Sequence, residues 1–164
     1  MQKTYRQCSF VAIALALMMT PLPAEALSIK QVYHGYKEGD AFRRISEYFT
    51  GKKNSDRRFI TLTRANDYGG YYFIIKLDKP ARTLPPGSQV EVAVIVPGKV
   101  KPQVYTVTVP RKKSRSHEIY AGITGQDWPD AKKIPTAWRI AIHDAHQAVL
   151  AQSQSFLWND DNEE

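Results

Sequence analysis

The chain has 164 residues, a formal net charge of +7 and a single cysteine, Cys8. This length suits one domain plus a short extra segment. One cysteine cannot form a disulfide within the chain, so a disulfide-stapled scaffold is excluded. The excess of basic residues favours anionic partners over cationic ones.

Residues 1–26 are typical of a bacterial export signal. Lys3 and Arg6 precede an apolar run at 10–19, and the A-x-A pattern of Ala24–Ala26 follows. The alternative is a membrane anchor, but the apolar run is shorter than the roughly 20 residues that a spanning helix needs. We therefore expect cleavage after Ala26, no transmembrane segment in the mature chain, and a location in the periplasm, at the outer membrane or on the cell surface.

Cleavage would remove Lys3, Arg6 and Glu25, which lowers the net charge by one to +6. It would also remove Cys8, leaving no disulfide, thiolate nucleophile or cysteine metal ligand. The chain has no N-x-S/T glycan acceptor either, which favours a bacterial source. We expect one domain at 27–158, followed by an acidic, disordered tail at 159–164.

Three runs in the middle of the chain alternate in the way that half-buried strands do. They cover Tyr71–Leu77, Val90–Val96 and Val104–Val109. Side chains on a strand point alternately to opposite faces, so each run places its β-branched or aromatic residues on one face. This pattern predicts the centre of an antiparallel all-β domain.

Weaker signals predict further elements on both sides of this centre. The expected strands are Ser28–Tyr36, Arg58–Arg64, a run through Ile119, Ala121 and Ile123, Ala137–His143, and Ala148–Trp158, with a bulge or an edge strand near Ser153–Ser155. One short helix is expected at Ala41–Phe49, after Asp40 as its N-cap. Turns are expected at Asn66–Gly70, Pro85–Ser88, Pro97–Pro102 and Asp144–Gln147.

Seven or eight short strands with one apolar face require a second layer to cover that face. A second sheet from the same chain is the economical solution. We therefore expect an immunoglobulin-like antiparallel β-sandwich of about 7–8 strands with one short helix and no disulfide. A small closed β-barrel is the alternative.

Three stretches carry a resemblance to known proteins: EIYAGITGQDWP at 118–129, PTAWR at 135–139 and QSFLW at 154–158. Over about 45–158 the chain resembles small exported proteins of verrucomicrobial and planctomycete bacteria. Some of those proteins resemble immunoglobulin-like domains encoded beside type IV pilus-type genes. The resemblance implies fold and export, and it supplies no catalytic residues.

Basic residues are the sharpest candidates for a binding site. They are Arg111, Lys112, Lys113 and Arg115 after the third central run, with Lys99 and Lys101 on the turn before it. Together they would form a positive patch for anionic glycan, lipid head groups or nucleic acid. The alternative is a pair of solvated loops that keep the protein soluble. No aromatic residues are interleaved for base stacking, which argues against nucleic acid.

A second basic stretch has the same two interpretations. It comprises Arg43, Arg44, Lys52, Lys53, Arg57 and Arg58.

His143, Asp144 and His146 carry metal-ligand chemistry on the last predicted turn. A metal site needs further converging ligands, and no motif supplies them. Turn formation explains Asp144 equally well. We expect no metal and no cofactor.

Two other clusters are open to a functional and a structural interpretation. Asp127 and Asp130 flank Trp128, as in the carboxylate pair and sugar platform of a glycosidase, but Trp128 would equally plug the end of a sandwich. Tyr68 and Tyr72 either contact a ligand or form cross-strand pairs under a covering element. We favour the structural interpretation of both clusters.

No reactive constellation is assembled in the sequence, and no G-x-S-x-G elbow gives a serine a nucleophile context. We therefore expect a non-enzymatic exported protein that acts through protein–protein contacts at the bacterial envelope or surface. Its expected partners are envelope or surface proteins, including further copies of itself and a pilus-like apparatus. The alternative is a module that binds anionic glycan or lipid head groups through the basic loops.

Overall fold

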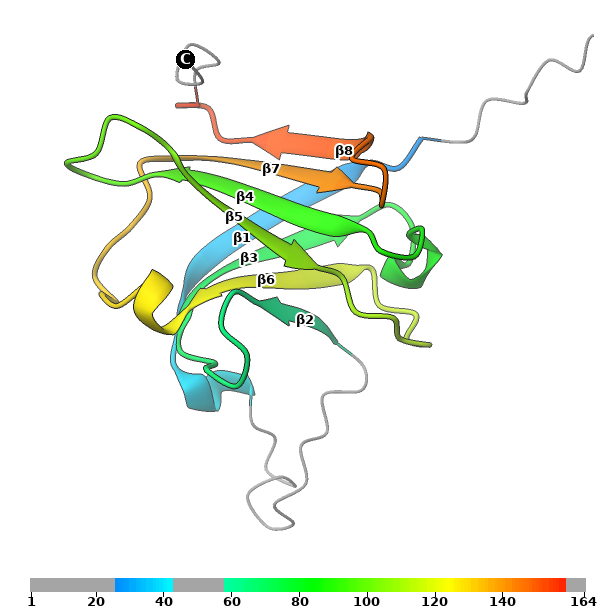
Figure 1. Cartoon of the computed structure of the whole chain (residues 1–164), viewed down its shortest axis with the longest axis horizontal. Coiled ribbons are helices and arrows are strands. Elements are labelled where there is room, and N and C mark those ends of the chain that lie inside the picture. The colour runs from blue at the N-terminus through cyan, green and yellow to red at the C-terminus, as the bar shows by residue number, and fades with distance from the viewer. Residues whose placement is uncertain (1–25, 43–57, 159–164) are drawn as a thin grey trace, which may run out of the picture.

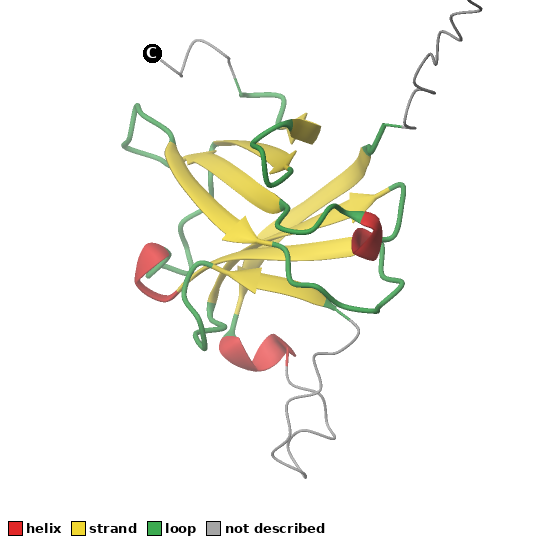
Figure 2. Cartoon of the chain, turned by 45° about the vertical axis from the view of Figure 1, so that its right-hand side comes forward, coloured by secondary structure: helices red, strands yellow, loops and turns green. Residues whose placement is uncertain are grey.

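The computed structural model describes residues 26–42 and 58–158, and these residues form mainly β-strands. The strands are β1 (Ile29–Lys37), β2 (Phe59–Leu62), β3 (Gly70–Leu77), β4 (Gln89–Ile95), β5 (Gln103–Thr108), β6 (Glu118–Thr124), β7 (Ala137–His143) and β8 (Val149–Gln154). Three short 3₁₀ turns are η1 (Gly39–Phe42), η2 (Ala81–Thr83) and η3 (Gly125–Asp127). Figure 2 shows these turns at the ends of the strands, outside the two sheets.

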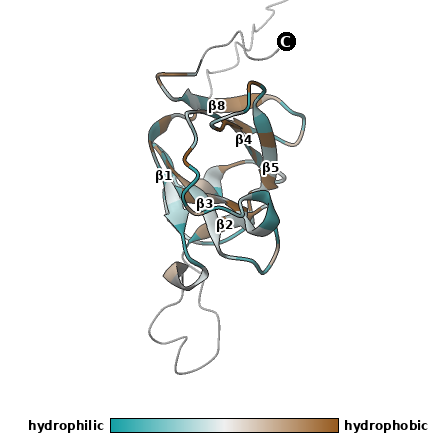
Figure 3. Ribbon diagram, turned by 90° about the vertical axis from the view of Figure 1, so that its left-hand side faces the viewer, coloured by the Kyte–Doolittle hydropathy of each residue, from teal (hydrophilic) through white to brown (hydrophobic). Residues whose placement is uncertain are grey.

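The strands form two four-stranded sheets. In the first sheet the order is β1-β3-β6-β2, and in the second it is β5-β4-β7-β8. Figures 1 and 3 show the two sheets as separate layers, with β1, β3 and β2 on one side and β8, β4 and β5 on the other. The predicted all-β sandwich is therefore confirmed in preference to a closed barrel.

The alternation in the sequence sets which side chains enter the core. On β3 the residues Tyr71, Phe73, Ile75 and Leu77 are all buried, as are the alternate valines of β4 and the alternate apolar residues of β6. These side chains meet between the two sheets in one core cluster. Transfer of such apolar surface out of water is the main driving force for the sandwich.

The strand order matches that of an immunoglobulin-like domain except at one edge. If β1, β3 and β6 are strands A, B and E, then β5-β4-β7-β8 reproduces the order C′-C-F-G of a variable-type domain. The fourth place of the first sheet, which strand D fills in that fold, is taken here by β2. The replacement of strand D by β2 changes one edge of the first sheet and does not affect the second sheet.

One pairing differs from the antiparallel prediction, because β2 runs parallel to β6. A short connection takes the chain from the end of β2 past β6 to the start of β3, and the backbone N–H of Thr63 donates to the carbonyl of Gly122 on the way. Since β2 leads into β3 through a reversal and β3 is antiparallel to β6, β2 and β6 must point the same way.

Aromatic packing joins the two strands that carry the inter-sheet disulfide in antibody domains. Phe73 of β3 and Trp138 of β7 make an edge contact with their ring centroids 6.0 Å apart, and His34 of β1 packs on both rings. Such contacts contribute about 0.5–1.5 kcal/mol each beyond their buried area. Here non-covalent packing of His34, Phe73 and Trp138 joins the two sheets in place of a disulfide.

The last strand ends earlier than predicted, at Gln154 instead of Trp158. The hydroxyl of Ser155 accepts a hydrogen bond from the backbone N–H of Trp138, and the chain then turns so that Trp158 packs on Ala93 and Ala137. β8 is an edge strand as expected, but its irregularity lies at its start, opposite Ile142 and His143. The burial of Trp158 therefore ends the strand.

The predicted helix at 41–49 lies mostly outside the described residues, and only its start falls within η1. The predicted turns are present: Asn66 and Gln147 take up the positive φ that such turns require. None of the helical segments in the described part of the chain has the length and apolar character needed to cross a membrane.

Candidate functional site

The structure separates the predicted basic residues into two groups. Lys99 and Lys101 lie on the hairpin loop between β4 and β5, at the left end of the molecule in Figure 1. Arg111–Arg115 follow β5 at the right end. The six residues of β5 span about 20 Å between the two groups. The single patch formed by all six basic residues is therefore absent.

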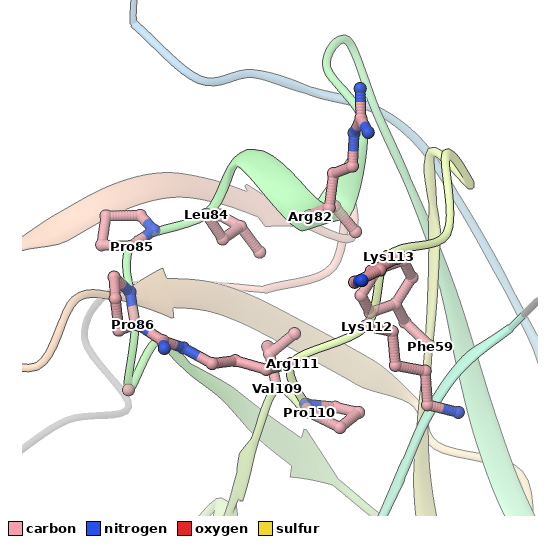
Figure 4. A pocket seen from close by; sticks show the side chains of 12 residues that line it. Phe59, Arg82, Leu84, Pro85, Pro86, Val109, Pro110, Arg111, Lys112 and Lys113 are labelled. Carbon is pink, nitrogen blue, oxygen red and sulfur yellow. The ribbon is translucent and has the colours of Figure 1, made fainter. Parts of the chain in front are cut away.

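The group after β5 contributes instead to a groove at its own end of the sandwich, here called the basic groove (Figure 4). The hollow measures about 490 Å³. Its lining residues are Phe59, Ala81, Arg82, Leu84, Pro85, Pro86, Gly87, Val109, Pro110, Arg111, Lys112 and Lys113. Its floor is the end of the apolar core, because Phe59, Ala81 and Val109 belong to the core cluster.

The segment that joins the two sheets forms one wall of the basic groove. Within it, Pro85–Ser88 make a tight turn in which the backbone N–H of Ser88 donates to the carbonyl of Pro85. Gly87 has a φ of +79°, which the third position of a type II turn requires and most residues cannot adopt. The buried hydroxyl of Ser88 donates to the same carbonyl, so the wall is held in place from within.

The segment after β5 forms the opposite wall. The backbone N–H of Val109 donates to the carbonyl of Ser88, which ties this wall to the first one. The ammonium of Lys112 donates to the carbonyl of Arg58 and points away from Pro85 and Pro86 in Figure 4. Lys112 therefore anchors its wall to the start of β2 and is less available to a ligand.

Three cations remain at the rim of the basic groove. Arg82, Arg111 and Lys113 are exposed, and no hydrogen bond or ion pair joins their side chains to another described residue. None of the twelve lining residues is acidic. Figure 4 shows the guanidinium of Arg111 beside Pro86 and that of Arg82 extending away from the other lining side chains. Neighbouring cations that lack a counter-charge among the described residues attract anions, and a low-dielectric surface strengthens their field. The arrangement suits a ligand that combines negative charge with apolar surface.

Sequence reasoning missed Arg82 and the apolar walls of the basic groove. Arg82 lies more than twenty-five residues before Arg111 in the chain, and the two meet because β3 and β5 both end on this side of the sandwich. The misplacement of Lys99 and Lys101 could have been avoided, since turns before and after one strand lie at its opposite ends. Arg115 is exposed and does not line the groove.

Most of the second basic stretch lies outside the described residues. Its one described member, Arg58, places its guanidinium 5.8 Å from the ring centroid of Tyr120.

The histidine–aspartate cluster forms a turn. One carboxylate oxygen of Asp144 accepts hydrogen bonds from the backbone N–H groups of His146 and Ala148. The imidazole Nε2 of His143 lies 3.9 Å from a carboxylate oxygen of Glu91 on the neighbouring strand. Within residues 26–42 and 58–158, no three side chains of metal-ligating type gather in one place.

The carboxylates near Trp128 are engaged in structural contacts. Asp127 accepts two hydrogen bonds from the guanidinium of Arg64, at 2.9 and 3.0 Å, and these bonds hold the pKa of its carboxyl below the usual value. Asp130 accepts a hydrogen bond from the backbone N–H of Lys132. Trp128 is only 2% exposed and packs on Tyr71, so it plugs the core and offers no platform to a sugar.

Tyr72 is likewise covered. Its ring is fully buried, and its hydroxyl donates to the carbonyl of Tyr68. Burial raises the pKa of this phenol strongly. Tyr72 is therefore covered, as favoured, but it forms no cross-strand pair of side chains, because its partners on the two neighbouring strands are Gly35 and Gly122.

No protein-family model, curated protein or solved structure matches this chain.

Proposed function

We propose that this protein is a non-enzymatic domain of the bacterial envelope or cell surface that acts through protein–protein contacts made by the basic groove. The partner is an acidic segment that also carries exposed apolar side chains. The observation that supports this proposal is that one groove combines three cations, which make no hydrogen bond or ion pair with another described residue, with the apolar side chains of Leu84, Pro85 and Pro86. Export is proposed from the signal-like residues 1–26. A role beside a pilus-like apparatus is proposed from the sequence resemblance.

The apolar floor favours a protein segment over the alternative ligands. The exposed Pro85 and Pro86 and the partly buried Leu84 present apolar surface to the hollow, over the buried core residues Phe59 and Val109. A polysaccharide or a lipid head group would satisfy the cations but would leave this apolar surface against polar atoms. A peptide with neighbouring acidic and apolar residues fills both parts of the groove. Apolar anchors surrounded by a polar rim are the usual anatomy of protein interfaces.

Binding of anionic glycan or lipid head groups stays as the second candidate, because the same three cations would hold sulfate, phosphate or uronate groups. Both candidates predict that affinity falls as salt rises, since screening at 0.15 M already shortens the field to about 8 Å. The two candidates differ in the apolar contacts of the ligand, which only a peptide with apolar side chains would make.

The test uses three immobilised probes: poly-glutamate, a glutamate–phenylalanine copolymer and alginate. We expect retention on the copolymer to exceed retention on the other two by about tenfold, which corresponds to about 1.4 kcal/mol of apolar contact. In the variant R82S/R111S/K113S retention should fall by at least about tenfold on every probe.

The matched control is K99S/K101S, which removes two exposed lysines at the opposite end of β5. Its retention should stay within about twofold of the unmodified protein, since those charges lie about 20 Å away. Equal retention on alginate and on the copolymer would favour the glycan candidate. Retention that survives the triple substitution would show that the basic groove is not the site.

A further inference from the structure

The C-terminal end of the described chain presents apolar side chains to solvent. Phe156 is 100% exposed and Leu157 is 63% exposed. The turn that carries them is fixed on both sides: the backbone N–H of Ser155 donates to the carbonyl of Trp138, and that of Trp158 donates to the carbonyl of Ser155. Trp158 itself is buried against β4 and β7. The two side chains are therefore held outward by ordered backbone.

Four carboxylates follow these apolar side chains in the sequence, starting three residues after Leu157. The residues after Trp158 read NDDNEE, with Asp160, Asp161, Glu163 and Glu164 and no basic residue. The segment 156–164 therefore joins two apolar side chains to a run of negative charge. The basic groove has the opposite charge and the same apolar character, so the two surfaces are complementary in chemistry.

The two complementary surfaces lie at opposite ends of the sandwich. Figure 1 shows the C-terminal end of β8 at the left, while η2 and the segment after β5 lie at the right. A seven-residue strand such as β7 covers about 23 Å between those ends. Phe156 and Leu157 are anchored at the left end and cannot enter the groove of their own molecule. The groove they fit belongs to a second copy.

We infer that the segment 156–164 of one molecule binds in the basic groove of the next, with Phe156 and Leu157 against Leu84, Pro85 and Pro86 and the acidic residues against Arg82, Arg111 and Lys113. This inference rests on the proposed function and names its partner as a second copy of the chain. The contact is heterologous, since each copy gives its tail and receives another at a different surface. A heterologous contact that does not close into a ring repeats into a head-to-tail chain.

The first measurement is the size of the purified protein by sedimentation velocity, over a range of concentrations and at low and high salt. We expect oligomers that grow with concentration at low salt and dissociate at high salt. Two variants should be monomeric under the same conditions: the groove variant R82S/R111S/K113S and the tail variant F156S/L157S/D160N/D161N/E163Q/E164Q. All the substituted groove residues and both apolar residues are exposed, so both variants should keep the melting temperature of the parent.

Mixing the two variants gives the sharpest outcome. The groove variant keeps an intact tail, and the tail variant keeps an intact groove. We expect the mixture to form a 1:1 dimer that does not grow, with an affinity within about threefold of the parent contact. A self-complementary contact built from one surface would not be restored in this way.

The outcomes separate the inference from the proposed function. A parent protein that stays monomeric at low salt but still binds the glutamate–phenylalanine copolymer overturns the inference and leaves the proposed function standing. Loss of copolymer binding as well overturns both. If oligomers persist in the tail variant, or if the mixture of the two variants forms no dimer, the contact between copies does not join the tail to the basic groove. Binding to anionic vesicles in place of a second copy also overturns the inference.

Discussion

Gly122 on β6 makes room for the ring of Tyr72. A β-carbon built at Gly122 would lie 2.6 Å from Cε1 of Tyr72 and 3.0 Å from Cδ2 of Leu62. The ring lies on the face of the sheet away from the core, yet it is fully buried. It lies over this glycine, and its hydroxyl donates to the carbonyl of Tyr68. One missing side chain thus allows an aromatic residue to stiffen the outer face of the first sheet.

This arrangement predicts that Gly122→Ala destabilises the protein. The added methyl group must displace a buried ring, and such overpacking costs about 1–3 kcal/mol. The measurement is the free energy of unfolding in urea.

Gly35 provides the matched control, since it pairs with Tyr72 from the other side, on β1. No heavy atom lies within 4 Å of a β-carbon built there. Gly35→Ala should therefore leave stability unchanged or raise it by less than about 1 kcal/mol. Equal losses in both variants would mean that strand propensity, and not the ring, sets the cost.

Among the elements, β2 links the two sheets to the candidate site. It has four residues, and among the described strands only β6 pairs with it. The hydroxyl of Thr61 donates to the carbonyl of Thr108 on β5 at 2.8 Å, which bridges the open side of the sandwich. The same strand supplies Phe59 to the floor of the basic groove. A short strand with few ladder bonds depends on such a bridge.

We predict that Thr61→Val lowers the free energy of unfolding by about 1 kcal/mol, because the side chain keeps its shape while the hydrogen bond from this buried position to the carbonyl of Thr108 is lost. Thr106→Val is the control, since Thr106 is exposed on the outer face of β5. It should change stability by no more than about 0.5 kcal/mol. Urea unfolding of the two variants measures the difference, and equal values would remove the bridge as an explanation.

At the scale of the whole molecule, stability depends on pH through two groups, the imidazole of His34 and the carboxylate of Asp127. His34 is exposed, but partial desolvation lowers its pKa below the usual value of 6.5, and its Nδ1 lies 2.8 Å from the hydroxyl of Tyr71. Hydrogen bonds from Arg64 lower the pKa of Asp127 below 3.8. In each case the unfolded chain binds the proton more readily than the folded chain.

We therefore predict that the melting temperature falls in two phases as the pH is lowered. The first phase begins below pH 6.5, where the unfolded chain protonates His34 before the folded chain does. The second begins below pH 3.8, where the same holds for Asp127. Melting of His34→Asn should lack the first phase and keep the second. A parent melting temperature that is flat from pH 7 to pH 5 would contradict the contribution of His34.

The sequence by itself determined the strands and their faces. Alternation of apolar and polar residues places β3, β4 and β5 within one residue of their observed bounds, because the side-chain period of a strand is local and does not depend on distant partners. The same local reasoning identified Trp128 as a core plug and Asp144 as a turn former. It failed at Trp158, where packing on β4 and β7 ends the last strand.

Only the tertiary structure decided the candidate site. Arg82 and Arg111 lie far apart in the chain and reach one groove because β3 and β5 end on the same side of the sandwich. Lys99 and Lys101 lie near Arg111 in sequence, but β5 separates them. The parallel pairing of β2, which brings Phe59 to the groove floor, also has no local signal. Strand order and direction arise from the burial of the whole core, so distances between remote residues are fixed only once the sheets have formed.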